Sequence, residues 1–253
     1  KLSSIFNPDF KVFEKLEHSF SNTLIMKSLL SLSSGKVFFI RSIVSLDKSI
    51  KKFSGKPLMY WTIKSLKESN IIKDIYISSE SDRILNYAKK QKIICIKRPK
   101  NLTYSRSQSE ESILHAIKCI KSDFDYIVFP QVTSPLRPKN IFDKSLRYFF
   151  KKKFDSLFSS NIPSKIFLWN ENKKLKPKYN INKRPMRQDI KRTFLENGSF
   201  YIFKKKGFLK SKNRLFGKIG TYIVDKKYSY DIDEEIDFKI NEIVKKKLLK
   251  SEY

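Results

Sequence analysis

The sequence is poor in glycine, alanine and cysteine. Its 253 residues include only 6 glycines, the alanines Ala88 and Ala116, and the cysteines Cys95 and Cys119, which form no CxxC motif. So few cysteines argue against a disulfide framework and favour a reducing, cytoplasmic compartment. Both cysteines fall in apolar stretches, which predicts that they are core residues.

Long apolar runs are also missing. No stretch approaches the roughly 20 residues that a membrane-spanning helix needs. The segment 24–32 is short and interrupted by Lys27, so it makes a poor signal peptide. We therefore expect no membrane partner. Hydrophobic residues still make up 40% of the chain, enough for one folded domain. Residues 1–35 show no clear period, and we treat them as an appendage to a domain at 36–253.

Acidic residues are few relative to basic ones. There are 54 Lys and Arg against 25 Asp and Glu, a formal charge of +29. Such a charge can indicate nucleic-acid binding, but the basic residues of a nucleic-acid site should gather on one element. Here lysines occur in every segment, beside many Ile, Asn and Phe, which is the profile of AT-rich codons. The runs 151–153, 204–206 and 245–247 lie at or near predicted helix ends and linkers. We expect no nucleic-acid partner.

From residue 36, short apolar runs alternate with segments of helical period. Strands are predicted at 37–43, 74–79, 93–96, 126–130, 198–203 and 220–224, and helices at 58–66, 81–91, 109–121, 138–151 and 234–249. This alternation predicts an α/β fold with a mostly parallel central sheet flanked by helices, whose ligand crevice lies at the carboxyl ends of the strands. The rhythm breaks at about 161–193, a polar stretch with three prolines that we interpret as an arm for dimerisation.

Polar side chains follow the predicted strand 126–130 in the segment QVTSPLR, residues 131–137. Gln131 offers an amide, Thr133 and Ser134 offer hydroxyls, and Arg137 offers a fixed fork of donors. A strand end is where an α/β enzyme places its ligand. A plain β-turn with proline at its bend would explain the same residues.

A second polar segment is Asp231-Ile232-Asp233. Residues two apart on an extended chain point the same way, so two carboxylates converge while Ile232 faces the core. Such a pair suits Mg²⁺, which binds one or two carboxylates together with water and substrate phosphates. Alternatively, these acids mark the start of the last helix, whose dipole favours negative charge. A third segment, ENGSFYIF at 196–203, places a turn signal before an aromatic strand.

Together these segments resemble a known family. QVTSPLR is similar to the Q-P-T-S-P-L-R of the acylneuraminate cytidylyltransferases, or CMP-sialic acid synthetases, of the bacterial type. ENGSFYIF resembles their N-G-A-F-Y-I, and YDIDEEIDF their V-D-I-D-T-x-x-D-F. GKPL at 55–58 and Arg98-Pro99 with Leu102 match further motifs in the same order, so the resemblance covers about 36–245. A related family activates 3-deoxy-manno-octulosonate, but the Asp pair and QxTSPLR favour the acylneuraminate side.

The resemblance implies a Rossmann-like nucleotidyltransferase fold, a homodimer, and transfer of CMP from CTP to a nine-carbon 2-keto sugar acid with release of pyrophosphate. It implies that Asp231 and Asp233 hold Mg²⁺, and that Lys48 and Asp233 are catalytic. The other implied contacts are to the nucleotide from Arg41, Ser49, Arg98 and Ser109, and to the sugar from Gln131, Lys165 and Arg187.

One segment departs from the family. The family's nucleotide loop reads P-A-R-x-G-S-K, whereas residues 38–50 read FFIRSIVSLDKSI and contain no glycine. Glycine lets backbone N–H groups approach phosphate closely, and Ile43 and Val44 are stiff. Lys48 falls at the catalytic lysine, Ser49 replaces a base-reading Asn, and Arg41 would stand in for the loop Arg. The alternative is a catalytically inactive homologue that keeps the fold and the dimer interface.

Overall fold

The structure is a computed structural model that describes residues 37–39, 46–102, 109–163, 167–172, 174–186 and 193–251. Contacts between Cα atoms divide the chain into the units 1–35 and 36–253. All described residues belong to the second unit, and it alone is considered below.

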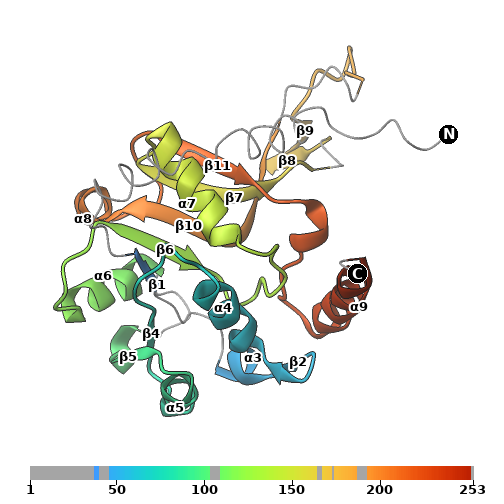
Figure 1. Cartoon of the computed structure of the whole chain (residues 1–253). Coiled ribbons are helices and arrows are strands. Elements are labelled where there is room, and N and C mark those ends of the chain that lie inside the picture. Colours follow the sequence, from blue (N-terminus) through green and yellow to red (C-terminus); the bar gives the residue numbers. More distant parts are fainter. Residues whose placement is uncertain are drawn as a thin grey trace, which may run out of the picture. The chain divides into compact units, whose positions relative to one another are not determined.

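The described part of the central sheet has the strand order β1-β6-β10-β7-β11 (Figure 1). The strands are β1 Val37–Phe39, β6 Tyr126–Pro130, β10 Leu195–Lys204, β7 Ser156–Asn161 and β11 Ile219–Ile223. β1 is parallel to β6 and β11 is parallel to β7, while β10 runs antiparallel to both of its neighbours. The predicted mostly parallel sheet is confirmed, with β10 as the reversed strand.

A second parallel pair continues beside β1. It consists of β4 Tyr76–Ser79 and β5 Ile94–Lys97, and β4 contacts β1. A short antiparallel pair, β2 Lys52–Phe53 and β3 Lys56–Pro57, precedes the first long helix. The described helices are α3 Leu46–Ile50, α4 Leu58–Lys67, α5 Asp82–Lys90, α6 Ser109–Cys119, α7 Ile141–Lys152, α8 Lys205–Ser211 and α9 Glu235–Ser251, with 3₁₀ turns at Lys100–Leu102 and Lys226–Tyr228.

Helices cover both faces of the sheet because successive strand residues point to opposite sides. Val128 of β6 and Phe200 of β10 belong to a core cluster that includes buried residues of α4, α5 and α7. Phe129 and Tyr201, one residue further along the same strands, belong to a second cluster with α6 and α8. The α/β architecture expected from the sequence is confirmed.

Two details differ from the sequence predictions. The helix predicted to start at 138 begins at Ile141, after Asn140 in the left-handed conformation. Cys119 is exposed, so the prediction that both cysteines are core residues is wrong for it; Cys95 is half-buried. The reason is helical period: Ile113 and Ala116 are buried on one face of α6, and Ile120, not Cys119, continues that face.

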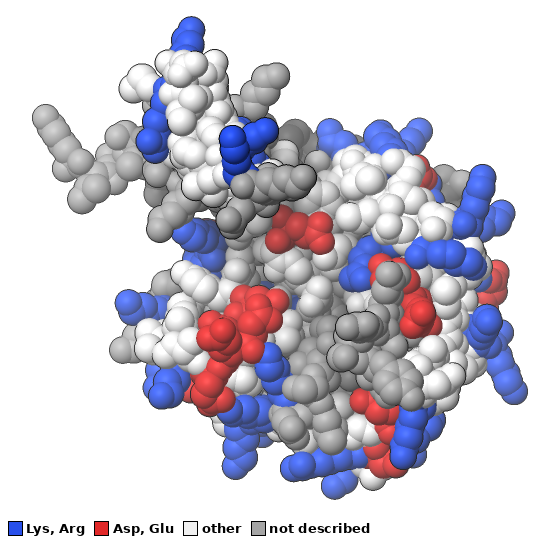
Figure 2. Space-filling model, turned by 180° about the vertical axis from the view of Figure 1, so that it is seen from behind, with Lys and Arg blue, Asp and Glu red and all other residues white. Residues whose placement is uncertain are grey.

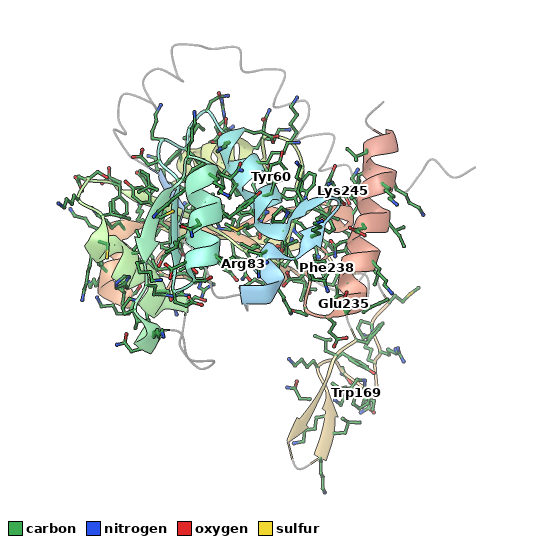
Figure 3. All side chains as sticks on the ribbon, turned by 90° about the horizontal axis from the view of Figure 1, so that it is seen from below. Tyr60, Arg83, Trp169, Glu235, Phe238 and Lys245 are labelled. Atoms are coloured by element: carbon green, nitrogen blue, oxygen red, sulfur yellow. The ribbon has the colours of Figure 1, made fainter. Side chains whose placement is uncertain are left out.

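The predicted arm contains a β-hairpin, β8 Trp169–Asn172 and β9 Lys174–Pro177, whose strands pair only with each other among the described residues. It stands off the central sheet, with Trp169 near its base (Figure 3). Phe167 and Trp169 contact the ring of Tyr179, at centroid distances of 5.1 and 5.9 Å. Leu175 remains exposed, so the hairpin presents apolar surface.

Basic side chains are scattered over the face shown in Figure 2, and groups of acidic side chains lie between them. On this face the positive charge forms no continuous stripe. Within the described ranges, no helix has the combination of length and apolar character that crossing a membrane requires.

Candidate active site

The three sequence motifs meet at one edge of the sheet. β6 ends at Pro130, and the N–H of Gln131 donates to the carbonyl of Ser199, in the first half of the reversed strand β10, at 2.9 Å. The N–H of Ile232 donates to the carbonyl of Thr133, also at 2.9 Å. Because β10 is antiparallel, its amino end lies beside the carboxyl ends of β6 and β7. This is where a ligand site is expected in an α/β sheet.

Arg137 connects two of these segments through side-chain hydrogen bonds to main-chain carbonyls. Its guanidinium donates to the carbonyls of Gln131 and Ser199, at 2.6 and 3.0 Å, and to Thr62 Oγ1 at 3.0 Å. Burial lowers the pKa of Arg137 to about 9, and the negative charge of Asp231 opposes this fall. A guanidinium with that pKa stays cationic at neutral pH. The fork of donors therefore organises the loop, whereas the sequence suggested that it could contact a ligand.

Gly198 has the positive φ that favours glycine, and two functional side chains lie close to it. Its φ is +65°, and the pairing of β10 with β7 shifts register between Glu196 and Tyr201, which marks a bulge. A Cβ at Gly198 would lie 3.5 Å from Gln131 Nε2 and 3.9 Å from Asp231 Oδ2. The amide of Gln131 and the carboxylate of Asp231 thus both lie close to this glycine.

The Asp231-Ile232-Asp233 segment has the predicted alternation. Ile232 is fully buried, Asp231 is half-buried and Asp233 is exposed. Asp231 Oδ1 accepts from Ser134 Oγ at 3.2 Å and from the N–H of Ile232 at 3.1 Å. Its other oxygen is the one near Gly198.

The alternative role predicted for the Asp231–Asp233 acids, stabilising the start of the last helix, is filled by Asp237. Asp237 Oδ2 accepts from the N–H groups of Asp233 and Glu234, at 2.9 and 2.7 Å, and so satisfies the donors at the start of α9. The carboxylate of Asp233 makes no hydrogen bond to the described residues, which leaves it available to a ligand.

The Asp231 and Asp233 carboxylates are of the donor type that Mg²⁺ takes in proteins. Among the described residues, no group of three or more His, Cys, Asp or Glu side chains could hold a metal. Two carboxylates that leave further positions to water and substrate phosphates are the usual Mg²⁺ arrangement.

Lys48, which lies 185 residues earlier in the sequence, contacts the segment at Asp233. Lys48 lies on α3, and its Nζ donates to the main-chain carbonyl of Asp233. Next to it, Lys51 forms an ion pair with Glu235, and the N–H of Ser54 donates to Glu242 at 2.6 Å. Figure 3 shows Phe238 and Lys245 on the side of α9 that faces the body. The predicted catalytic pair, Lys48 and Asp233, is therefore brought together, whereas Ser49 beside it is buried.

The remaining predicted nucleotide contacts lie around α6. Arg98 follows β5 and is only 3% exposed. Its guanidinium forms an ion pair with Glu80 and donates to Ser112 Oγ at 2.9 Å. Ser109 is the first residue of α6. The described contacts of Arg98 are thus internal to this part of the fold. The predicted positions Arg41, Lys165 and Arg187 lie outside the described residues.

A pocket of about 360 Å³ opens beside Gly198 and Asp231. Its other described lining residues are Asn161, Leu195, Glu196, Asn197 and Ser229. Such a volume lies in the range of small-molecule sites. Sequence reasoning missed Asn161, Glu196 and Ser229. The signal available was that Glu196 directly precedes the Asn-Gly turn.

Comparisons with known proteins show the family of this chain. The family model described as cytidylyltransferase matches residues 46–252. The chain is 31% identical over 202 residues to N-acylneuraminate cytidylyltransferase B of Danio rerio, covering 77% of this chain but 47% of that protein. It therefore spans about half the length of that relative. It is 27% identical to post-translational flagellin modification protein B of Campylobacter coli, covering 81% of this chain and 91% of that protein.

Among solved structures, the fold is similar to that of CMP:2-keto-3-deoxy-manno-octonic acid synthetase in complex with CTP. The TM-score is 0.60 at 9% identity, covering 87% of this chain and 100% of the other. This likeness supports the nucleotidyltransferase fold. The family resemblance drawn from the motifs is confirmed, and this chain belongs to the cytidylyltransferase family.

Proposed function

We propose that this protein transfers CMP from CTP to a nonulosonic, sialic-acid-like sugar acid and releases pyrophosphate. The observation that carries the proposal is the convergence of Lys48, Gln131, Asp231 and Asp233 at the carboxyl edge of the sheet. The segments QVTSPLR, ENGSFYIF and YDIDEEIDF, which carry the family resemblance, meet there. The Danio rerio relative is named for the same transfer.

In this reaction the anomeric hydroxyl of the sugar acid attacks the α-phosphate of CTP, and the bond to the pyrophosphate oxygen breaks. Negative charge builds on the leaving group and must be stabilised. Asp231 and Asp233 would hold the Mg²⁺, which supplies that positive charge when bound. Lys48 places an ammonium group at the same segment, and Gln131 offers an amide donor and acceptor to the sugar.

The direct test is pyrophosphate release from CTP and Mg²⁺ with a panel of nine-carbon 2-keto sugar acids, including neuraminic, legionaminic and pseudaminic types. We expect release with at least one of them and with CTP in preference to the other nucleoside triphosphates. Release with 3-deoxy-manno-octulosonate alone would assign the chain to the related activity. A well-folded protein that releases no pyrophosphate with any acceptor would favour the inactive homologue.

The nucleotide loop gives a separate prediction. Ser49 is buried and the segment 38–49 lacks glycine, so few close backbone donors are available to a triphosphate. Replacing residues 38–49 with a P-A-R-x-G-S-K loop, Lys48 retained, should tighten CTP binding tenfold or more, about 1.4 kcal/mol. Calorimetric titration of CTP into both proteins measures this. Ordinary micromolar affinity in the natural chain, with no gain from the graft, would show that the present loop is a working variant.

A homodimer through the arm belongs to the same proposal. The hairpin carries Leu175 exposed at 64%, and the arm contains Arg187, which the family resemblance sends across a dimer interface to the sugar's carboxylate. Sedimentation should give about twice the 30.0 kDa chain mass. Leu175→Ser should shift the protein toward monomer, whereas Leu249→Ser, at a leucine on α9 that is exposed at 52%, should not. An active protein that stays monomeric at all concentrations would remove the arm from the site.

A further inference from the structure

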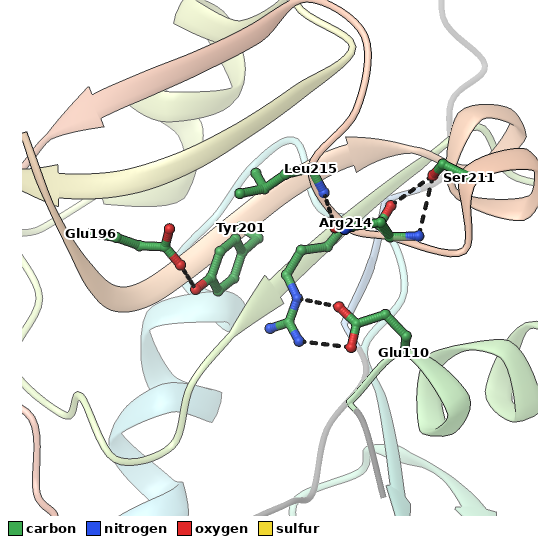
Figure 4. Close-up of polar contacts among 7 residues, drawn as sticks. Glu110, Glu196, Tyr201, Ser211, Arg214 and Leu215 are labelled. Carbon is green, nitrogen blue, oxygen red and sulfur yellow. Dashed lines mark hydrogen bonds and ion pairs between the residues drawn. The ribbon is translucent and has the colours of Figure 1, made fainter. Parts of the chain in front are cut away.

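Glu196 is a carboxylate in the pocket that no motif role accounts for. It lies at the start of β10, is exposed, and lines the pocket together with Asn161 and Asp231. One of its oxygens, Oε1, accepts a hydrogen bond from the phenol of Tyr201, five residues further along the same strand (Figure 4). The register shift of β10 against β7 falls between the two residues, and Gly198 with its positive φ lies within it.

Tyr201 is itself firmly held. Its side chain is only 5% exposed, and the guanidinium of Arg214 lies 4.8 Å from its ring centroid. Arg214 in turn forms a two-pronged ion pair with Glu110, at 2.7 and 3.0 Å, which fixes its plane (Figure 4). Burial and the hydrogen bond to Glu196 raise the pKa of Tyr201, so the phenol keeps its proton and donates. A buried donor thus holds one oxygen of Glu196, while the other oxygen makes no hydrogen bond to the described residues.

The other polar groups of the pocket divide into satisfied and available ones. Asn197 Oδ1 accepts from Ser159 Oγ at 2.6 Å and from the N–H of Ser199 at 3.2 Å, and Nδ2 donates to Ser229 Oγ at 2.9 Å. The amide of Asn197 is therefore used within the protein. Glu196 Oε2, Asp231 Oδ2 and the side-chain amide of Asn161 make no hydrogen bond to the described residues, and all three residues line the pocket.

The charge of the pocket indicates which groups it accepts. Its described lining residues include two carboxylates and no cation. A carboxylate or phosphate of a ligand would be repelled by Glu196, whereas a hydroxyl group would donate to it. Hydrogen bonds to an ionised acceptor are stronger than those between neutral groups.

We propose that Glu196 is a specificity-determining residue that accepts hydrogen bonds from the hydroxyl groups of the neutral part of the sugar, with Tyr201 as its positioning residue. The inference rests on the proposed function for the class of substrate. A site built to bond a substrate hydroxyl discriminates strongly against the analogue that lacks it, because the buried or oriented acceptor is left unpaired.

The test compares the best sugar acid of the panel with analogues that each lack one hydroxyl group. We expect the wild-type kcat/KM to fall tenfold or more for at least one analogue. In Glu196→Ala the same ratio should fall below about threefold, with the KM for CTP unchanged within twofold. Glu196→Gln, which keeps an acceptor but loses the charge, should give an intermediate ratio. Glu68→Ala, an exposed glutamate at the end of α4, serves as the matched control and should retain the wild-type ratio.

Tyr201→Phe tests the positioning role, since it removes the phenol but keeps the carboxylate. It should reduce discrimination at the same hydroxyl. In the double variant with Glu196→Ala, the discrimination should be no lower than in Glu196→Ala alone. Undiminished discrimination in Glu196→Ala would overturn the inference while leaving pyrophosphate release intact. If the wild type releases no pyrophosphate, binding of N-acetylneuraminic acid and its deoxy analogues is followed by saturation-transfer NMR. Loss of discrimination between the sugar acid and its deoxy analogues in Glu196→Ala then supports the inference. Discrimination that is the same in the wild type and in Glu196→Ala overturns it.

Discussion

Asp233→Asn should lower turnover by about a hundredfold or more, at least ~2.7 kcal/mol in the barrier, at saturating Mg²⁺. The substitution removes one of the two carboxylates that would hold the ion while keeping the size of the side chain. Because Asp233 is exposed and its carboxylate bonds to no described residue, the melting temperature should hardly change. Steady-state pyrophosphate release and thermal unfolding of the same preparation measure the two effects.

Glu234→Gln is the matched control for this variant, since it removes a neighbouring exposed carboxylate at the same helix start. It should keep turnover within a few-fold of the parent. Near-parental turnover in Asp233→Asn would show that the metal pair is wrongly assigned, and a loss of equal size in both variants would point to the general charge of this segment instead.

Arg137→Met should destabilise the protein by roughly 2 kcal/mol or more, because hydrogen bonds to charged groups contribute about 1.5–3 kcal/mol each and the guanidinium donates to two main-chain carbonyls. Methionine fills much of the space of the arginine stem but offers no donor to Gln131 or Ser199. Activity should fall more than stability alone explains, because the two segments that Arg137 joins also position Gln131 and Gly198.

Arg83→Met is the comparison for this variant. Arg83 is an exposed arginine on α5, and its loss should change the free energy of unfolding by less than about 0.5 kcal/mol (Figure 3). Denaturant titration of both variants measures the difference. An Arg137→Met protein as stable as the parent would mean that the loop is held by its backbone hydrogen bonds without the guanidinium.

The elements found from sequence are those with a clear hydrophobic period. The segment 126–130 was predicted as a strand from its continuous apolar run, and β6 has those bounds. Central strand β7 was missed because Ser156, Ser159 and Ser160 interrupt its apolar pattern. All three are buried, and their hydroxyls are hydrogen-bonded. A strand rich in serine has the sequence pattern of a loop, and only the hydrogen-bond partners of its hydroxyls distinguish the two.

The site was foreseen in its residue types more than in its contacts. The Asp231-Ile232-Asp233 alternation follows from the two-residue period of extended chain, and Ile232 is indeed buried. Arg137 points inward because it donates to the carbonyls of Gln131 and Ser199. Ser199 is 62 residues from Arg137 in the sequence and comes close to it only in the folded sheet. Pocket residue Glu196 was read as part of a turn because its support comes from Tyr201 and the bulge.

The contact between Lys48 and the segment at Asp233 has a consequence for synthesis of the protein. The two residues are 185 positions apart, and α9 follows Asp233 directly. A chain still emerging from the ribosome can pair β1 with β6, and then insert β10 between β6 and β7, before this contact exists. The candidate site is thus completed only when the segment that leads into α9 contacts α3, so a partly made chain can form most of the sheet before Lys48 and Asp233 meet.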